Sequence, residues 1–536
     1  MALFVMLSFL FVTLIQKLGD RTWQATEEQM TALLQEQLKG LNEAGAEDEL
    51  IAELTYDGIQ IPYDQGSRTF YLPVNIKEPV FEAARLKTDS PDTRLLLSEE
   101  ALPDDIAAAM AENSAVPAYL LSDTSYMKCN LAFTGLPVMS MTSSGEVTEG
   151  ELMLFDLSLV EAASGGLKET KALTTGTLRG NTSLTYEKKS LRLKLKQRDG
   201  DQIKKKNVSL LGLRKDDDWI LNSLYADNTR LRDKLCMDLW QEVGAKSNTL
   251  GVSMGVKGEY VEVVIDHGYA GLYLLSFPVD AKLLHMDSVS QQLRDGIGSQ
   301  NVERIYKKKY SAPLLSEYFV GDLPDANMPD YRGGYLLKGD TIQQSEEEWA
   351  PLHELAGLME ADDAAFSDGV VRLCDASNVM ENWLFYQATG AFDNENKNHY
   401  FVTRNTTEGL KGYFIPWDMN ISFGCVYTEN EYYCKESMEA LKTEVIFEPG
   451  SRMYHLDAGG SAALAKKTWK RWRSDVFRTD ALMNRIDQLQ HQLTASGALI
   501  REQQRWPMGN AGDDLTFMKS FTKKRLQWLD ELLAGG

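Results

Sequence analysis

Two apolar runs that each end in acids and amides constrain the fold of this chain more than any other feature. The first run, Trp383 to Ala391, is followed by the polar series DNENKN at 393–398. The second run, Gly412 to Trp417, is followed directly by Asp418. The residues between the runs alternate in polarity as a strand does. The pattern predicts a buried helix, a polar loop, a hairpin and a carboxylate at a strand end.

The side chains at the ends of these runs are those that a hard cation binds. Polar groups beside apolar runs are costly unless they have partners, and Mg²⁺ prefers oxygen ligands. Phosphoryl transfer uses one Asp near the hydroxyl and an Asn with a second Asp on Mg²⁺. A hairpin between Asp393 and Asp418 can bring the two acids together. On spacing alone, the alternative is that these residues only form turns.

Composition narrows the classes of partner and site. The 536 residues carry 78 acidic and 56 basic side chains, a formal net charge of −22. A general binder of nucleic acid is expected to be basic, so nucleic acid is disfavoured, and basic partners are favoured. Five cysteines form no C-x-x-C pair and the six histidines are scattered, which argues against a zinc site. Cys425 and Cys434 are close enough in sequence to pair if the chain is exported.

The N-terminus predicts export. Residues 1–15 are apolar and the first charge is Lys17, which is short for a spanning helix but fits a signal peptide or signal anchor. A basic n-region and an A-x-A cleavage site are absent. We therefore expect an exported protein at the cell surface, either tethered to the membrane through residues 1–15 or secreted.

Patterning divides the rest of the chain into further segments. Asp57-Gly58 and a second turn lie between alternating strands, which predicts a β-hairpin. Short apolar strands follow from Val116, and helical spacing dominates the tail. The expected segments are a signal peptide or anchor over 1–20, an accessory region with a β-hairpin over 21–115, a β-rich lobe over 116–340 and a mostly helical lobe over 341–536.

A basic strand in the β-rich part offers a candidate anion site. Ser190 to Lys196 alternates leucines with Arg and Lys, and the turn Arg179-Gly180-Asn181 precedes it. A glycine turn with free amides beside Lys188 and Lys189 can hold an anion. The alternative is a solvated strand face with an ordinary loop.

Four pieces of the sequence, in order, resemble the CotH family of spore-coat and secreted kinases. LRGNTSLTYEKKSLRLKL resembles its R-G-N-x-S…K-K-S strand, and SLLGLRKDDDWILNSLYADNTRLRDKL its L-L…W-x-L-N…D-x-S-x-x-R-N segment. VEVVIDHGYAGLYLLS resembles its V-x-I-N-G-x-Y-x-G-x-Y strands. The stretch described first resembles its G-N-x-D…K-N-Y-Y and P-W-D-x-D-x-S-F-G pair. The resemblance extends from about residue 130 to the C-terminus.

The resemblance implies an α+β, atypical protein-kinase-like fold of two lobes that uses ATP and Mg²⁺ to phosphorylate Ser or Thr of proteins. It implies that Asp393 is the catalytic acid and that metal ligands come from the later loop positions. These ligand positions are Asn398, Asp418 and Asn420. It further implies that ATP phosphates are held by Arg179, Asn181, Lys188 and Lys189. The two lysines adjoin on one strand and face opposite sides, so only one is the clamp, and Lys189 is preferred.

Three departures from the family pattern keep a second interpretation open. Phe277 stands where the family has Glu, Asn420 replaces the second Asp of W-D-x-D, and Arg232-Asp233 replaces R-N. If that Glu pairs with the clamp lysine, its loss weakens ATP positioning. The alternative is therefore a catalytically degenerate kinase fold that acts as a cell-surface, spore or envelope binding or scaffold protein. The acidic charge also suggests a basic, Ser-rich protein substrate.

Overall fold

The computed structural model is a mixed α+β structure. The expected signal segment over 1–20 and Asn181 lie outside the residues that it describes. Within the described ranges, no helix is long and apolar enough to cross a membrane. The structure describes residues 22–25, 41–45, 48–98, 102–147, 152–180, 182–247, 250, 254–311, 314, 331–339, 346–428, 431–434, 441–507 and 515–535.

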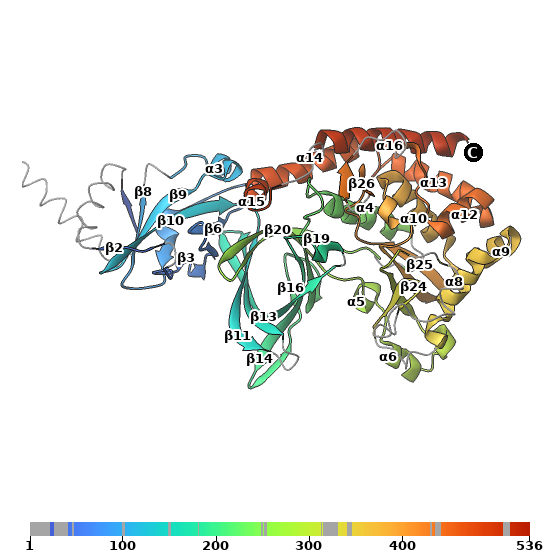
Figure 1. Cartoon of the computed structure of the whole chain (residues 1–536), viewed down its shortest axis with the longest axis horizontal. Helices are drawn as coiled ribbons and strands as arrows, with labels where there is room; N and C mark the ends of the chain where they lie inside the picture. Colours follow the sequence, from blue (N-terminus) through green and yellow to red (C-terminus); the bar gives the residue numbers. More distant parts are fainter. Residues whose placement is uncertain are drawn as a thin grey trace, which may run out of the picture. The chain divides into compact units, whose positions relative to one another are not determined.

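The chain forms two compact units, which are described separately below (Figure 1). The first unit contains residues 1–223, 259–275 and 491–508. The second contains residues 224–258, 276–490 and 509–536. Each unit therefore combines segments that are far apart in the sequence.

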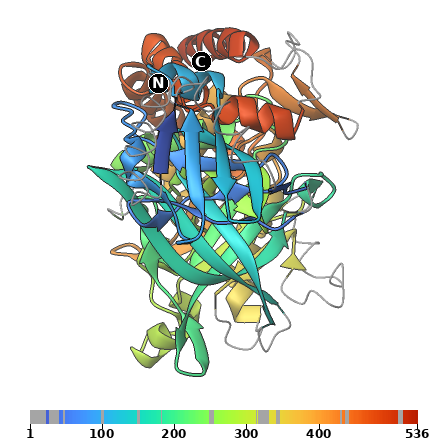
Figure 2. The ribbon, with the colours of Figure 1, turned by 90° about the vertical axis from the view of Figure 1, so that its left-hand side faces the viewer.

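The first unit begins with an N-terminal module of two sheets (Figure 2). The expected hairpin is present, because Asp57 and Gly58 turn between β3 and β4 with positive φ angles. The larger sheet has the order β1 (Thr22–Ala25), β8 (Arg94–Ser98), β9 (Val116–Leu121), β10 (Ser125–Thr134), β6 (Thr69–Pro73) and β5 (Tyr63–Asp64), with β2 (Asn42–Glu43) on β10. The smaller sheet has the order β4 (Ile59–Gln60), β3 (Leu54–Tyr56) and β7 (Leu86–Thr88), and α3 (Ile106–Glu112) and a 3-10 turn at Ala83–Arg85 accompany the two sheets.

Seven longer strands of the first unit close into a barrel. Their order is β13 (Gly166–Arg179), β12 (Met153–Ala163), β11 (Val138–Val147), β19 (Gly258–Ile265), β20 (Gly268–Ser276), β18 (Asp218–Asn222) and β14 (Ser190–Asp199), and β14 also pairs with β13. The expected alternation over Ser190 to Lys196 is confirmed in part: Leu193 and Leu195 are fully buried and the basic residues beside them are half-buried, but Leu191 is also only half-buried. The unit also contains a 3-10 turn at Thr182–Leu184, β15 (Gln202–Lys205), β16 (Val208–Ser209), β17 (Lys215–Asp216) and α15 (Ala498–Arg505).

A buried polar cluster joins the module, the barrel and α15 within this unit. Arg501 of α15 donates to both carboxylate oxygens of Glu262 on β19, at 2.7 and 2.8 Å. The Tyr269 hydroxyl and the Thr134 hydroxyl donate to the same carboxylate. Burial alone would raise the pKa of Glu262, but the charge and hydrogen bonds of Arg501 outweigh it and lower the pKa. The N-terminal module is thus tied to the barrel by a fully satisfied ion pair.

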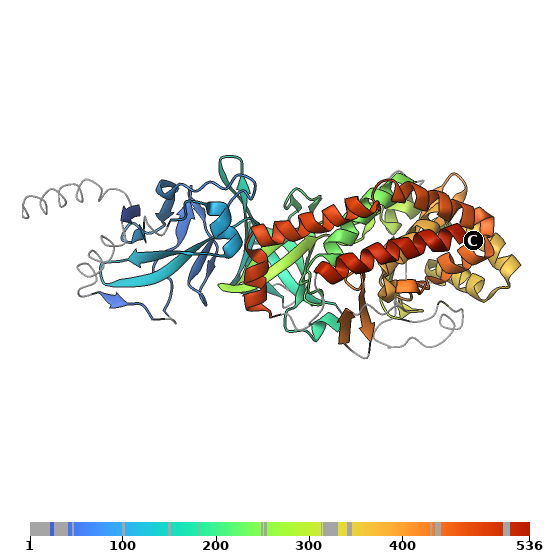
Figure 3. The same ribbon diagram turned by 90° about the horizontal axis from the view of Figure 1, so that it is seen from above.

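The second unit contains a five-stranded sheet and a set of helices, and the helices lie in front in the view of Figure 3. The sheet has the order β22 (Tyr331–Arg332), β23 (Tyr335–Lys338), β21 (Arg304–Lys308), β24 (His399–Thr406) and β25 (Gly409–Pro416). The helices are α4 (Arg232–Ser247), α5 (Ala281–Leu284), α6 (Val289–Arg294), α8 (Ala350–Glu360), α9 (Asp363–Leu373), α10 (Ala376–Thr389), α12 (Glu448–Leu456), α13 (Ser461–Arg473), α14 (Thr479–Ala495) and α16 (Leu515–Gly535). Short 3-10 turns occur at Ser299–Asn301, Glu346–Trp349, Phe392–Asn394 and Ala458–Gly460. The helical tail predicted from the sequence is confirmed.

A short hairpin of the second unit carries the two cysteines that are close in sequence. Strand β26 (Cys425–Thr428) pairs with β27 (Glu431–Cys434), and Cys425 lies opposite Cys434 in the register. The Cys425 thiol is buried and free in the structure.

Buried Lys308 on β21 predicts a pH dependence of stability. Burial lowers the pKa of Lys308 to about 7, against 10.5 for an ordinary lysine. Between these two values the unfolded chain binds more protons at this residue than the folded chain, so the free energy of unfolding should rise with pH. Lys308→Met should flatten that rise, as measured by denaturant unfolding at pH 7 and pH 9. An unchanged pH slope in the variant would contradict the assignment.

Candidate active site

The polar loop predicted from the sequence follows directly after α10. Helix α10 starts at Asp375, whose carboxylate accepts a hydrogen bond from the Asn378 N–H, and its residues from Asn378 to Thr389 are all buried. Gly390 ends it with a left-handed φ of 61°. The chain then turns through a 3-10 segment, Phe392–Asn394, which presents Asp393. The predicted buried helix followed by a polar loop is confirmed.

Both oxygens of Asp393 have partners from its own loop. The Lys397 ammonium lies 2.8 Å from one carboxylate oxygen. The Asn398 side-chain amide donates to the other at 2.7 Å. The five-residue step from Asp393 to Asn398 equals that between the base and the metal-binding Asn in the catalytic loop of protein kinases.

Hairpin β24–β25 brings the second acid to the same loop, as the sequence predicts. His399 at the start of β24 pairs with Pro416 at the end of β25. The Trp417 N–H donates to the Asn398 carbonyl at 3.0 Å. Buried Asn394 donates through its side-chain amide to the carbonyls of Asn398, at 2.7 Å, and Trp417, at 3.0 Å. These bonds fix the position of Asp418 relative to Asn398.

The pKa of Asp393 reflects its burial and the charged and polar groups around it. Burial raises the pKa of Asp393, the neighbouring Lys397 and Asn398 lower it, and the charge of Asp418 raises it again. The net pKa is above the ordinary value for Asp. A carboxyl group with a raised pKa is a stronger proton acceptor once it is ionised.

The oxygen atoms around Asp418 fit a hard cation. Asp418 is exposed and its backbone is left-handed, with φ 56°. The amide nitrogen of Asn398 is engaged with Asp393, which leaves its side-chain oxygen for another partner. Asn420 adds a second amide, and a carboxylate with amide oxygens suits Mg²⁺. Among the described residues, no three His, Cys, Asp or Glu side chains form a metal cluster, so phosphate or water would have to complete the coordination.

The start of α4 supports the loop that follows Asp418. The Asp233 carboxylate accepts a hydrogen bond from the Met419 N–H at 2.9 Å. Arg232 is fully buried, donates to the Ser422 carbonyl at 2.8 Å, and forms an ion pair with Asp227. The departure Arg232-Asp233 therefore has a structural role: both residues hold the backbone of residues 419–422.

In the first unit, Lys188 forms a buried ion pair that the sequence did not reveal. Its ammonium lies 2.7 and 2.8 Å from the two carboxylate oxygens of Glu502 on α15, and both side chains are fully buried. The Leu272 N–H donates to Glu502 at 2.8 Å, and the Lys188 ammonium also donates to the Leu272 carbonyl. Phe277 therefore does not leave Lys188 without an acidic partner.

Lys189 and Arg179 occupy different surroundings from Lys188. Lys189 donates to the carbonyls of Leu184 and Tyr186, so its ammonium is bound to the backbone of the loop that precedes it. Arg179 is the last residue of β13, and Gly180 follows with φ 121°. Lys188 is thus the lysine of a lysine–glutamate pair, while the sequence-based preference for Lys189 as the phosphate clamp stays a prediction. Within the second unit the structure brings Asp393 together with Asn398, and the Trp417–Asn398 hydrogen bond holds Asp418 close to this loop.

Two of the partner residues described above, Lys397 and Glu502, differ in whether the sequence could have identified them. Lys397 belongs to the polar series and its spacing from Asp393 could have identified it. Glu502 is separated from Lys188 by 314 positions and lies in an ordinary helical pattern, so no local signal points to it.

Comparison with known proteins identifies the family. The CotH family profile, described as CotH kinase protein, matches residues 177–529 of the 536, well over half of the chain. A search of curated proteins finds no match. The matched range contains Asp393, Asn398, Asp418 and the Lys188–Glu502 pair. The chain therefore belongs to the CotH family.

Proposed function

We propose that this protein is a kinase that transfers the γ-phosphate of ATP to Ser or Thr of a protein substrate with Mg²⁺. The observation that carries the proposal is the arrangement of Asp393, Asn398 and Asp418. One acid is held by Lys397 and Asn398, and the other stands exposed at the end of the adjoining hairpin. Family membership supports kinase-like chemistry in general.

The candidate site residues of the second unit have different roles in phosphate transfer. Asp393 accepts the proton of the Ser or Thr hydroxyl as its oxygen bonds to the γ-phosphorus and the bond to the bridging oxygen of ADP breaks. Mg²⁺, when bound, neutralises phosphate charge. Asn398, Asp418 and Asn420 would hold it. Lys397 orients Asp393 and stabilises its ionised form.

In the first unit, Lys188 would supply positive charge to the nucleotide, with Arg179 and Asn181 shaping the adjoining turn. Glu502 fixes the lysine in place, the role that a helix glutamate has toward the phosphate-binding lysine of protein kinases. Glu502 is thus a positioning residue.

Transfer to an acceptor tests the proposal. Label from the γ-phosphate of ATP should appear on Ser or Thr of a Ser-containing acceptor protein, and a chelator that removes Mg²⁺ should stop the transfer. Label transfer that continues in the presence of chelator would contradict the assigned metal residues.

A second candidate function rests on the burial of Lys188. Its side chain has no exposed surface and its ammonium is already paired with Glu502. A protein with this lysine permanently enclosed would bind partners on a kinase-like fold without catalysis, as a surface, spore or envelope scaffold. Asn420, which carries no charge, points the same way because it lowers the anionic character of the metal site.

The substrate and location are part of the same proposal. The net charge of −22 favours a Lys- or Arg-rich, Ser-containing substrate at the cell surface, to which export would deliver the enzyme. Comparing the phosphorylation of basic and acidic Ser peptides tests the preference. Equal rates for the two peptides would contradict it.

A further inference from the structure

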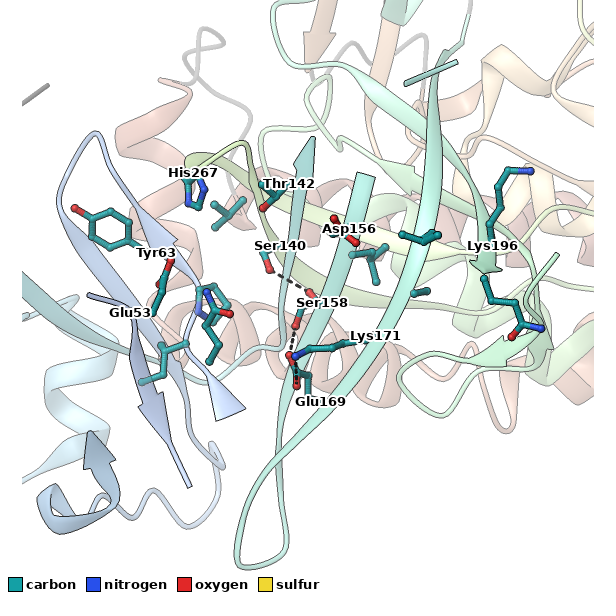
Figure 4. A pocket seen from close by; sticks show the side chains of 18 of the residues that line it. Glu53, Tyr63, Ser140, Thr142, Asp156, Ser158, Glu169, Lys171, Lys196 and His267 are labelled. Carbon is teal, nitrogen blue, oxygen red and sulfur yellow. Dashed lines mark hydrogen bonds and ion pairs between the residues drawn. The ribbon is translucent and has the colours of Figure 1, made fainter. Parts of the chain in front are cut away.

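A groove of about 580 Å³ lies within the first unit, between the N-terminal module and the outer face of the barrel (Figure 4). Glu53, Gln60 and Tyr63 line it from the module. Strands β11, β12 and β13 line it from the barrel, and Lys196 stands at the far end from Glu53. Most of its lining precedes residue 177, where the family match begins. The groove is therefore largely a property of the part of the chain outside the family match.

Strand register places polar side chains in rows across the floor of the groove. Ser140, Ser158 and Lys171 are direct partners across β11, β12 and β13. The next row consists of Thr142, Asp156, Leu173 and Lys196, which continues to β14. Three strand spacings of about 4.8 Å make this row roughly 14 Å long. An extended peptide of about four residues has that length.

Some charged side chains of the groove form ion pairs and others do not. Glu169 is paired, because the Ser158 hydroxyl donates to it at 2.7 Å and Lys171 lies 3.2 Å away. Glu53 and Asp156 form no ion pair within the described part of the chain, and neither does Lys196. Two carboxylates without an ion pair therefore share the groove with two ammonium groups without one, Lys196 and Lys206, and the Lys206 ammonium donates to the Lys171 carbonyl.

The environment of Glu53 indicates what a ligand would supply. Burial raises the pKa of Glu53, a hydrogen bond from Gln60 and the neighbouring imidazole of His267 partly offset this, and Asp89 adds to the rise. A partly buried carboxylate without an ion pair is costly, and a bound Lys or Arg would remove much of that cost.

Apolar groups in the groove suit the rest of such a ligand. Buried Ile61 and Val264 line it together with Leu173. Lysine and arginine side chains bury an aliphatic stem while their charged end reaches a polar partner. Carboxylates next to apolar surface therefore match these side chains better than they match a small inorganic cation.

We propose that this groove docks an extended segment of a partner protein that carries Lys or Arg toward Glu53 and Asp156. An acidic residue of the same segment would face Lys196, which sets the direction of the segment. The site binds the partner separately from any transfer of phosphate.

A peptide array tests the proposal on the whole protein without nucleotide. The array varies Lys, Arg, Glu and uncharged residues along extended peptides, and binding is compared between wild type and two isosteric variants, Glu53→Gln and Asp156→Asn. Wild type should select peptides with Lys or Arg. Each variant should weaken the best peptide about tenfold, the effect of losing a charged hydrogen bond. Because no nucleotide is present, failure here leaves the proposed kinase activity untouched.

Glu112→Gln is the matched control, because Glu112 is an exposed acid of α3 in the same unit but outside the groove. It removes the same charge and should leave affinity unchanged. Selection of peptides without Lys or Arg, or equal binding by wild type and the double variant Glu53→Gln/Asp156→Asn, would overturn the proposal. The melting temperatures of all variants confirm that each is folded.

Discussion

Asp393→Ala should reduce the rate of phosphate transfer by about 10²–10⁴-fold, because general-base catalysis contributes about that much. The metal candidates Asn398 and Asp418 remain, so the affinity for Mg²⁺ and ATP should change far less than the rate. Steady-state kinetics on an acceptor peptide separates the two: kcat falls, while KM for ATP stays near its wild-type value.

Asn396→Ala is the control for Asp393→Ala, because Asn396 lies in the same loop and takes no part in the hydrogen bonds around Asp393. Its activity should stay close to that of wild type. Transfer by Asp393→Ala at the wild-type rate would show that another group accepts the proton.

Glu502→Ala should destabilise the first unit by about 3–5 kcal/mol, since it leaves the buried ammonium of Lys188 without its counter-charge. The carbonyl of Leu272 and the ring of Tyr273, 4.5 Å from the Lys188 ammonium, would remain beside it. Denaturant unfolding measures the loss. Gln503→Ala, an exposed change on the same helix, should stay within about 0.5 kcal/mol of wild type.

A double variant separates the charge from the packing at this pair. Lys188→Met with Glu502→Leu removes both charges and keeps comparable volume, so it should recover much of the stability lost in Glu502→Ala. If Glu502→Ala is as stable as Gln503→Ala, the pair contributes nothing to the fold.

Local pattern was enough to predict the elements around the candidate site. The apolar run after Asn382 became the buried part of α10, and the alternation from His399 became β24. Asp418 follows the end of β25, as the second apolar run indicated. These predictions succeeded because periodicity and turn chemistry act over a few residues.

Long-range partners could not be predicted in the same way. The preference for Lys189 as the phosphate clamp stays a prediction, but the pairing of Lys188 with Glu502, which lies on a helix near the C-terminus, had no signal in the sequence. The support of Met419 by Asp233 also depends on a contact across 186 positions. Pairings of this kind follow from tertiary packing, which a single sequence does not specify.

Thermal unfolding of wild type and of Asp418→Asn, each with and without ATP and Mg²⁺, tests whether Asp418 helps to bind Mg²⁺-ATP. Asparagine tolerates the left-handed backbone of Asp418, so this variant removes the charge with little backbone strain. At 100 times its dissociation constant, Mg²⁺-ATP should stabilise wild type by about 2.7 kcal/mol. We expect a melting shift that requires Mg²⁺ and is largely lost in Asp418→Asn. No shift in folded wild type at millimolar ATP, or an equal shift in the variant, would contradict it.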